Sequence, residues 1–481
     1  MAITVIRMLA VLLLIIATTF LIPSAFALYY GETIAIKAFL FPMLFVYVVA
    51  GLFLFIFRKK KNMRLSTRSG FAIVASGWIT AGLLGAVPFL LSGTITNVFD
   101  AIFESVSGFT TTGATILSDV ENLPKCINMW RVQMCWLGGM GIVALTVALM
   151  PLLGVGGFQL IKAETTGPEK GKITPKITMT AKLLWFIYLG MTVVQTILLL
   201  LCGMSFFDAL AHSFSTLGTG GFSTRNASIG HYNSAAIDWV CITFMALAGV
   251  NFSLYYQVLI GKGREMLENT EFKVYVSILF ICTLAITFII MPLYNNFFSA
   301  LRFSAFQAVS ITTTTGLGTA DFDKWPAAAQ MIIFSLMFIG GSSGSTSGGV
   351  KVVRWVVMSK QASNEIRRMI HPHGIFSIRL NGRAGRKDIV FNVTSFMLVY
   401  FILLAITTFV ASCGGADLFS AFTASLALVG NVGPGFAMVG PTQNYGFFAD
   451  AAKLWFSFAM LAGRLELYTM IIFFFPVYWR K

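Results

Sequence analysis

The feature that most constrains this chain is a series of apolar runs, each about as long as a lipid bilayer is thick. A membrane-spanning helix needs about 20 apolar residues, and the 481-residue sequence holds ten runs of that kind. They lie near residues 5–24, 34–57, 70–92, 131–153, 180–203, 236–260, 272–293, 327–358, 388–412 and 450–478. Only 11% of the residues are charged, against about 25% in a soluble domain. The sequence therefore predicts an all-α polytopic membrane protein.

Shorter apolar segments lie between some of these runs, and each ends in a loop rich in glycine. The segments near 97–109, 205–217, 298–311 and 417–429 are too short to cross a bilayer. The loops that follow them are Thr110-Thr111-Thr112-Gly113, Gly218-Thr219-Gly220-Gly221, Thr313-Thr314-Thr315-Gly316 and Gly430-Asn431-Val432-Gly433. Self-similarity at a spacing of roughly one hundred residues indicates four tandem units. Each unit is predicted to be a span, a short pore helix and a second span.

This repeat fixes the predicted organisation of the chain. Residues 1–57 form an accessory segment of two spans, and the repeats occupy 70–153, 176–261, 271–360 and 387–481. The repeats run in parallel orientation, whereas many solute carriers have inverted ones. We therefore expect one site built from four quarters.

Basic residues indicate how the chain is oriented. They cluster within 58–68, 162–182, 262–264 and 351–387, each cluster after an even-numbered span. The positive-inside rule places these clusters and both termini in the cytoplasm, and the glycine loops toward the outside. The net charge of +15 is thus explained by membrane orientation, and no nucleic-acid partner is expected. Residues 1–27 also resemble a signal peptide, but we expect an uncleaved first span.

The four loops have the chemistry of a monovalent-cation site. A short helix that stops within the membrane directs its partially negative C-terminal end at the centre of the assembly, and glycine allows carbonyl oxygens to turn inward. No Asp or Glu lies in 110–115, 218–223, 313–318 or 430–435, whereas calcium sites use carboxylates. One such loop alone is usually a helix-ending turn. Four in phase can replace the water shell of an ion, as in carbonyl-lined potassium filters.

A run of glycine, serine and threonine from Gly340 to Gly349 interrupts the span near 327–358. Ten such residues in succession break a helix, and non-helical backbone at membrane depth requires protein or a water-filled cavity around it. We predict that this loop lines an aqueous path. A cytoplasmic linker is the alternative, although linkers are usually followed by polar sequence. The candidate residues are Gly340, Gly341, Gly344, Ser345, Thr346, Gly348 and Gly349.

The last span carries two charges, Arg464 and Glu466. A charge near the bilayer centre costs at least about 2.5 kcal/mol, so it normally faces a cavity and has a partner. Arg464 is therefore a candidate functional residue. The alternative is a structural role, in which Arg464 pairs with a carboxylate such as Glu466 of a neighbouring chain or with loop carbonyls. On one helix the two residues would not face each other.

Nothing in the sequence indicates an enzyme. The four histidines are dispersed, and His371 and His373 have no other metal ligands nearby. The six cysteines are scattered, which argues against a disulfide framework. The polar connection at 163–172 lacks the spacing of a phosphate-binding loop. We read it as a solvated or partner-contacting loop.

Taken together, the motifs resemble those of the Trk/Ktr/HKT superfamily of potassium transporters, specifically its TrkH-like membrane subunits. The matching segments are 107–115, 220–224, 313–316, 431–435, the linker 163–175, the run 340–354 and 463–466. The resemblance covers essentially the whole chain. It implies potassium uptake across a bacterial inner membrane through a gated, channel-like pore, with K⁺ as the transported ion and no covalent cofactor. It also implies that one chain forms a pseudo-tetrameric arrangement around a single central pore. Two such chains would form a homodimer with separate pores, controlled by a cytosolic nucleotide-binding regulatory subunit.

The resemblance also assigns roles to residues. It places the filter glycines at Gly113, Gly221, Gly316 and Gly433, and the coordinating carbonyls at Thr111, Thr112, Thr219, Gly220, Thr314, Thr315, Asn431 and Val432. The gate maps to 340–349 and the pore-facing arginine to Arg464. The fourth loop has no threonine, so a less selective K⁺/Na⁺ transporter is one alternative and a Na⁺- or H⁺-coupled symporter another. A membrane potential alone supplies about 2.3 kcal/mol per 100 mV, so coupling is unnecessary in principle.

Overall fold

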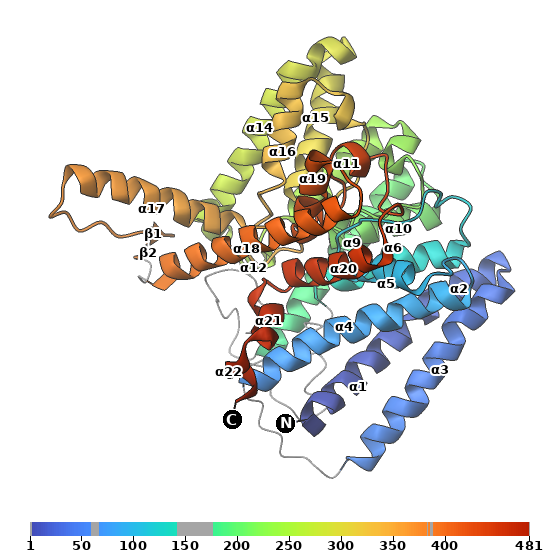
Figure 1. Cartoon of the computed structure of the whole chain (residues 1–481). Helices are drawn as coiled ribbons and strands as arrows, with labels where there is room; N and C mark the ends of the chain where they lie inside the picture. The colour runs from blue at the N-terminus through green and yellow to red at the C-terminus, as the bar shows by residue number, and fades with distance from the viewer. Residues whose placement is uncertain (1, 59–66, 142–176, 382, 385–387, 481) are drawn as a thin grey trace.

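The structure is a computed structural model that describes residues 2–58, 67–141, 177–381, 383–384 and 388–480. Its α-helices are α1 (Ala2–Thr19), α2 (Leu21–Tyr30), α3 (Thr33–Ile56), α4 (Thr67–Leu91), α5 (Val98–Phe109), α6 (Lys125–Gly139), α9 (Ile177–Leu201), α10 (Phe206–Gly218), α11 (Ala235–Ala248), α12 (Phe252–Leu259), α13 (Gly263–Glu268), α14 (Thr270–Tyr294), α15 (Phe297–Thr312), α16 (Ala327–Leu336), α17 (Val352–Ile370), α18 (Asp388–Cys413), α19 (Leu418–Val429), α20 (Asp450–Arg464), α21 (Tyr468–Ile471) and α22 (Pro476–Trp479). Two-residue strands, β1 (Arg379–Leu380) and β2 (Arg383–Ala384), pair antiparallel after α17. The predicted all-α class is confirmed (Figure 1).

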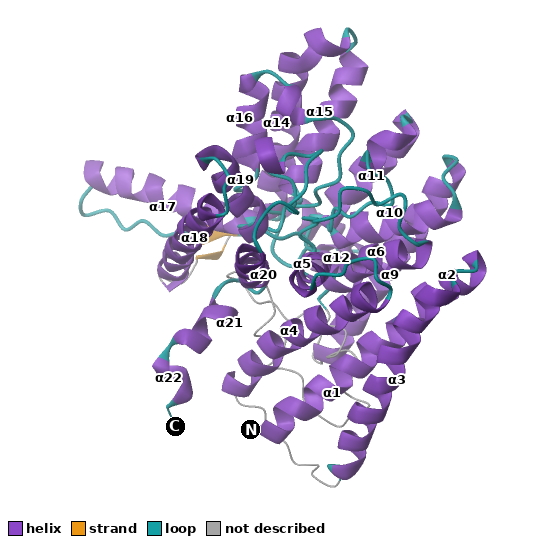
Figure 2. Ribbon diagram, turned by 45° about the vertical axis from the view of Figure 1, so that its right-hand side comes forward, coloured by secondary structure: helices purple, strands orange, loops and turns teal. Residues whose placement is uncertain are grey.

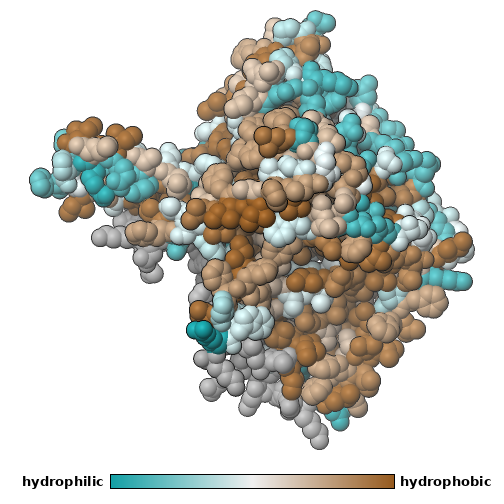
Figure 3. Space-filling model, viewed as in Figure 1, coloured by the Kyte–Doolittle hydropathy of each residue, from teal (hydrophilic) through white to brown (hydrophobic). Residues whose placement is uncertain are grey.

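Several helices have the length and composition of membrane spans. Within the described part of the chain, six helical stretches qualify, or up to eight if each bent helix pair is one span. The six are Ile3–Tyr30, Thr33–Ile56, Arg68–Leu91, Thr180–Leu201, Thr270–Tyr294 and Ile389–Cys413. Their outer faces expose large apolar side chains, such as Phe45 on α3 and Phe391 on α18. Apolar residues cover the face over α4 and α18 in Figure 3, as expected of a surface that meets lipid.

The second span of each repeat departs from the continuous helix that hydropathy predicts. The run near 236–260 bends by 94° between α11 and α12, and the run near 450–478 bends by 120° after α20. The first bend exists because backbone from elsewhere docks into the break: Ser342 N–H donates to Gly249 O, and Phe252 N–H donates to Gly344 O. Both flanks of the break remain apolar, so a hydropathy run cannot reveal it. The run near 131–153 lies partly outside the described residues.

The four predicted short segments are helices α5, α10, α15 and α19, and they begin in the same way. A polar side chain caps each N-terminus by accepting a backbone N–H, a common way to satisfy the unpaired donors of a first turn. The cap residues are Asn97, Ser205, Asn296 and Asp417. Each short helix packs against the long helix that precedes it, which is α4, α9, α14 or α18. Sequence offsets and local structure thus repeat together.

The repeats close into a ring because the second helix of each one packs against the short helix of the next. Helix α6 contacts α10, α11 contacts α15, and α20 returns to contact α5. The remaining junction is aromatic: Phe334 of α16 lies 6.3 Å and 6.1 Å, between ring centroids, from Phe419 and Phe422 of α19. Loop segments gather in the middle of this ring in Figure 2.

Helices α1, α2 and α3 lie outside the ring and pack on the first repeat. Phe20 sits with its ring centroid 5.8 Å from Phe39 and 4.8 Å from Trp130 of α6. The Glu32 carboxylate accepts the backbone N–H groups of Lys125 and Cys126 at 2.6 and 3.0 Å. It thereby caps the first turn of α6, where donors are unpaired and negative charge is favoured. The N-terminal segment is therefore part of the packed structure.

Candidate ion site and the loop beneath it

The four short helices end in one shared backbone motif. The residue two before each loop glycine is left-handed: φ is +56° at Thr111, +51° at Thr219, +54° at Thr314 and +52° at Asn431. The next residue donates its N–H to the carbonyl five positions back, at 2.8 to 2.9 Å in all four loops. This is the Schellman pattern of helix termination, which usually has glycine at the left-handed position. A β-branched residue there is a strained outlier, and three of the four loops have one.

The loop glycines are left-handed as well, and they close the loops into a ring. Their φ values are +77° at Gly113, +73° at Gly221, +78° at Gly316 and +97° at Gly433. A Cβ on Gly113 would lie 2.5 Å from Gly220 O, and one on Gly221 would lie 2.5 Å from Thr315 O. In the same way, Gly316 faces Val432 O and Gly433 faces Thr112 O. Each glycine thus touches the carbonyl that precedes the next glycine, and the fourth loop returns to the first.

The four loops have the same backbone conformation but differ in the hydrogen bonds of their side chains. Thr110 and Thr112 share a hydroxyl hydrogen bond of 2.8 Å, and Thr313 and Thr315 share one of 2.7 Å. In the fourth loop, the amide of Asn431 donates instead to Thr112 Oγ1 at 2.9 Å and to the carbonyl of Met460 at 3.0 Å. The first and third loops therefore match, while the fourth is held by contacts of its own.

Outer links join each neighbouring pair of loops above the ring. Asn226 connects the second loop to the first by accepting Val120 N–H at 2.8 Å, and Gly230 N–H donates to Gly318 O at 3.1 Å. The Asp323 carboxylate accepts Ala437 N–H at 3.1 Å, and Tyr445 N–H donates to Thr115 O at 2.8 Å. All four junctions of the ring are thus hydrogen-bonded.

A buried ion pair between Arg131 and Glu104 lies next to the first two loops. It was not among the residues predicted from the sequence. Arg131 Nε lies 2.8 Å from Glu104 Oε1, and both side chains are almost fully buried. Glu104 also accepts Ile116 N–H at 3.0 Å, while Arg131 donates to Ser223 O of the second loop at 3.3 Å. A lone charge inside an apolar helix usually has a partner, so Glu104 within a short apolar segment was the available signal.

The Gly340–Gly349 loop lies beneath the third and fourth glycine loops. A Cβ on Gly348 would be 2.8 Å from both Asn431 Cβ and Gly430 O, and one on Gly349 would be 3.4 Å from Thr314 Cγ2. The loop rests on the break between α11 and α12, where Ser342 N–H donates to Gly249 O at 2.8 Å. The structure thus places the predicted gate segment inside the fold and in contact with the ring. Most of the loop is buried, which a solvated linker would not be.

Charged side chains hold this loop from several directions. Arg464 donates to Thr346 O at 2.7 Å, and also to Gly138 O and Gly139 O at 2.7 and 2.9 Å. Buried Lys351 donates to the carbonyls of Ser347 and Gly348. Arg464 therefore contacts loop carbonyls, which the sequence analysis gave as one alternative, and one of them belongs to a gate candidate.

A carboxylate on α14 holds both ends of the same loop. Glu271 Oε1 accepts Ser343 N–H at 2.8 Å, Ser343 Oγ–H at 3.2 Å and Val353 N–H at 3.1 Å. Val353 lies in the first turn of α17. Glu271 was also missed, because it sits at the first turn of a span, where a charge is unremarkable in sequence. The nearby Glu466 pairs with Arg354 of the same chain.

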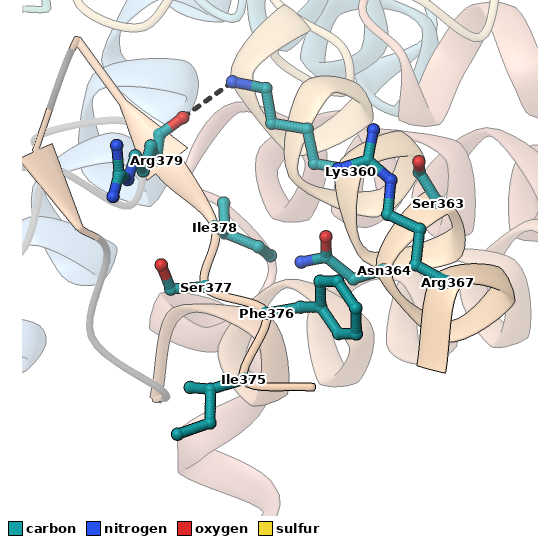
Figure 4. Close-up of a pocket in the computed structure, with 9 residues that line it drawn as sticks. All are labelled: Lys360, Ser363, Asn364, Arg367, Ile375, Phe376, Ser377, Ile378 and Arg379. Atoms are coloured by element: carbon teal, nitrogen blue, oxygen red, sulfur yellow. Dashed lines mark hydrogen bonds between the residues drawn. The ribbon is translucent and has the colours of Figure 1, made fainter. Parts of the chain in front are cut away.

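A separate hollow of about 420 Å³ opens beside the arm formed by α17 (Figure 4). Its lining is basic and apolar, and Lys360 Nζ donates to Arg379 O at 2.6 Å. The residues around it are Lys360, Ser363, Asn364, Arg367, Ile375, Phe376, Ser377, Ile378 and Arg379. None of the residues that line this hollow belongs to the four-loop ring. It is a surface feature of the arm.

The candidate site is a backbone site. Among the described residues, no group of three or more His, Cys, Asp or Glu side chains could hold a metal ion. The fourfold helical ring and the apolar outer surface are features of a multi-pass membrane protein.

Comparison with known proteins identifies the class more closely. Residues 36–481 match the family model TrkH, described as a cation transport protein, and the chain belongs to this family. It is 38% identical over 483 residues to the Trk system potassium uptake protein TrkH of Escherichia coli K12, covering 99% of each chain. It is 33% identical to TrkG of the same organism, with 95% of each covered. These relatives are named as uptake proteins, so the expectation that the chain is not an enzyme is confirmed.

A solved structure supports the same assignment. The crystal structure of the potassium transporter TrkH from Vibrio parahaemolyticus superposes with a TM-score of 0.88 at 34% identity, covering 100% of both chains. The resemblance found in the motifs is therefore confirmed for the family and for the fold. The roles of individual residues in the ring and the loop remain predictions.

Proposed function

We propose that this chain takes up potassium through a pore along the axis of the four repeats, with the glycine loops as its selectivity filter. The observation that carries the proposal is the closed ring in which each loop glycine abuts the carbonyl of the next loop. Uptake of potassium is also the activity for which its full-length relatives are named. Coordination would come from the carbonyls of the residues just before the glycines, not from charged side chains.

Electrostatics favours a monovalent cation in this ring. The C-terminal ends of α5, α10, α15 and α19 carry partial negative charge and meet at the loops. The loops contain no carboxylate, so the site lacks the formal charge with which proteins usually bind divalent cations. Neutral carbonyls can replace the hydration shell of K⁺ without trapping it. Glu104, which is buried behind the first loop, is paired with Arg131 and does not add net charge.

We also propose that the Gly340–Gly349 loop and Arg464 form the gate. The loop lies directly beneath two filter loops. Arg464, at the end of α20 in the fourth repeat, connects it to the end of α6 in the first repeat. A fixed positive charge below a cation filter opposes the passage of a cation by Coulomb repulsion. Opening would require the loop and the arginine to move together.

The proposed setting is the inner membrane of a bacterium, with both termini in the cytoplasm. We further propose a homodimer in which each chain has its own pore, and control by a cytosolic nucleotide-binding subunit. The arm of α17 offers a surface for such a partner, because Met369 and Ile375 are 85% and 99% exposed beside Arg367 and Arg368. Exposed apolar residues ringed by polar ones commonly mark contact sites.

A less selective K⁺/Na⁺ pathway is the second candidate, and the fourth loop is the observation that favours it. Asn431 replaces the threonine found at the other left-handed positions, and its amide is committed to Thr112 and Met460. The fourth loop of the proposed filter is thus held by side-chain hydrogen bonds that the other three loops do not share. Such asymmetry lowers the number of equivalent carbonyls that can tell K⁺ from Na⁺ by field strength.

Rubidium uptake by the purified protein in liposomes, driven by an imposed inside-negative potential, tests the proposal. We expect potential-dependent uptake that K⁺ inhibits far better than Na⁺, and none in protein-free liposomes. Equal inhibition by Na⁺ would favour the second candidate. Accumulation beyond the equilibrium set by the potential would identify coupling to Na⁺ or H⁺. A complete lack of potential-driven uptake would overturn the proposed pore.

A further inference from the structure

One hydrogen bond connects the glycine-loop ring to the loop beneath it. Thr314 Oγ1, in the third glycine loop, accepts the backbone N–H of Gly348 at 2.6 Å. Both residues are buried or nearly so. The donor comes so close only because residue 348 is glycine: a Cβ there would press on Asn431 and on Gly430 O. The contact is therefore built into both segments.

The three equivalent side chains do not make this contact. Thr111 Oγ1 is buried and has no hydrogen-bond partner within the described residues. Thr219 Oγ1 donates to the adjacent Gly218 O at 2.7 Å, and Asn431 bonds to Thr112 and Met460. Four left-handed positions with the same backbone thus have four different side-chain environments. Of these four, Thr314 alone holds the Gly340–Gly349 loop by a hydrogen bond in the part of the chain that the structure describes.

We propose that the Thr314 hydroxyl is a positioning group that couples the filter to the gate. This inference rests on the proposed function of the ring and the loop. Threonine in a left-handed conformation is strained and persists only when its surroundings hold it. At Thr314 the surroundings include the N–H of Gly348, so withdrawal of the gate loop removes one restraint on the third filter loop. In the other direction, distortion of the third filter loop releases the gate.

The coupling makes the third repeat the one through which gate and filter communicate. The carbonyl of Thr314 is one of those that the sequence predicts to coordinate the ion, and its hydroxyl makes the contact with the gate loop. The carbonyl and the side chain are attached to the same Cα, whose φ is +54°, so a backbone rotation at this residue moves both. Gly348 in turn accepts from Lys351 through its carbonyl, which links the contact to the start of α17.

Hydrogen exchange and transport by the full-length protein test the coupling. Thr314→Val keeps the β-branched shape and the carbonyl but removes the acceptor, and Thr111→Val makes the same change at a hydroxyl that has no partner among the described residues. We expect faster amide exchange in the peptide covering 344–351 for Thr314→Val only, by about two- to tenfold, the range that corresponds to one net hydrogen bond. Rubidium uptake should rise by a similar factor. Thr314→Ser, which retains the hydroxyl, should restore the exchange rate of the parent.

Two results would contradict the proposed coupling. Unchanged exchange in Thr314→Val, or the same increase in Thr111→Val, would overturn the coupling. If valine prevents folding, Thr314→Ala and Thr111→Ala replace the pair. The exchange comparison needs no transport, so it tests the bond even if the parent shows no rubidium uptake. That last result would instead contradict the proposed function.

Discussion

The glycine-loop ring and the segments beneath it differ in how far they keep the fourfold repeat. In the ring, all four loops share the same left-handed positions and the same helix-ending hydrogen bonds. Beneath it, the second helix of the second repeat bends by 94°, that of the fourth by 120°, and that of the third gives way to the Gly340–Gly349 loop. The ring is formed by a backbone motif that all four repeats share. The lower part is held by side chains that are each present in one repeat only.

This difference separates the two tasks that we propose for the molecule. Backbone carbonyls in a repeated motif can surround an ion evenly, which suits selection. A single arginine, lysine or glutamate cannot be symmetric about the axis, but it can hold or release one loop, which suits control. Changes in the ring should therefore alter which ion passes. Changes beneath it should alter how much passes.

The largest effect is expected for Gly113→Ser in the ring. Serine at φ +77° is strained by about 1–2 kcal/mol, and its Cβ would also press on Gly220 O at 2.5 Å. The first and second loops must then separate, so the preference for Rb⁺ over Na⁺ should fall at least about tenfold, the ratio that 1.4 kcal/mol represents. Competition between the two ions in liposome uptake measures this preference.

Gly93→Ser is the matched control for that change. Gly93 has φ +72°, close to that of Gly113, but nothing lies within 4 Å of its Cβ position. The backbone strain is thus reproduced without the contact to a neighbouring loop, and ion preference should stay at the parent value. An equal loss of preference in both variants would show that strain alone, and not the closed ring, explains the result.

Arg464→Ala should raise flux by about five- to tenfold while leaving ion preference intact. The change removes donors to Thr346 O and to Gly138 O, each at 2.7 Å, and hydrogen bonds from charged groups contribute about 1.5–3 kcal/mol. Arg464→Lys keeps the charge but cannot reach both segments with one planar fork, so an intermediate flux is expected. A change in ion preference without a change in flux would reverse the roles given to the two regions.

Much of the fold follows from sequence because it is repeated. The four short helices begin and end within about two residues of the segments found from apolar length and loop glycines, and Gly113, Gly221, Gly316 and Gly433 are all left-handed. Capping side chains at Asn97 and Asp417 were locally encoded too. A single glycine turn would not have predicted a site, whereas its recurrence in four places did.

The contacts that hold the loops could not be derived in the same way. Glu104 and Arg131 are 27 residues apart in the chain and meet only once α5 packs on α6. The break after Ala248 lies within a predominantly apolar run, and Ser342 and Gly344 dock there. Thr111 and Thr314 both lie in a Thr-Thr-Thr-Gly motif, but within the described residues only the Thr314 hydroxyl has a hydrogen-bond partner. Such differences arise in tertiary packing and leave no local signal.

Glu271→Ala tests whether the loop beneath the ring has more than one anchor. The carboxylate accepts Ser343 N–H and Val353 N–H at 2.8 and 3.1 Å, so its removal leaves two buried donors unpaired and frees both ends of the loop. We expect flux to rise about two- to fivefold, less than for Arg464→Ala, because Arg464 would still hold Thr346. Glu268→Ala, three residues earlier and exposed, is the control. If both variants transport like the parent, Glu271 has no part in gating.

The smallest effect concerns the outer links, where Asp323 and Asp119 join different pairs of loops. Burial, with the nearby Asp321 charge, raises the pKa of Asp323 to about 6, so the folded state retains a proton that the unfolded chain loses near pH 4. The free energy of unfolding should therefore fall as the pH rises from about 4 to about 6, and Asp323→Asn should remove that fall. Because the group is only half-buried, the change should be no more than about 1 kcal/mol.

Asp119 should behave in the opposite sense, because the hydrogen bond from the Asn226 side chain lowers the pKa of its carboxyl group. Its contribution to stability is present above about pH 4, the ordinary value, and is lost as the pH falls below it. Denaturant unfolding of the detergent-solubilised protein at pH 4.5 and 7.5 separates the two. Asp323→Asn should gain stability relative to the parent only at the higher pH, and Asp119→Asn should lose it there. If both substitutions change the free energy of unfolding in the same direction, the two outer links have the same sign of pH dependence. The difference between the junction of the third and fourth loops and that of the first and second would then be absent.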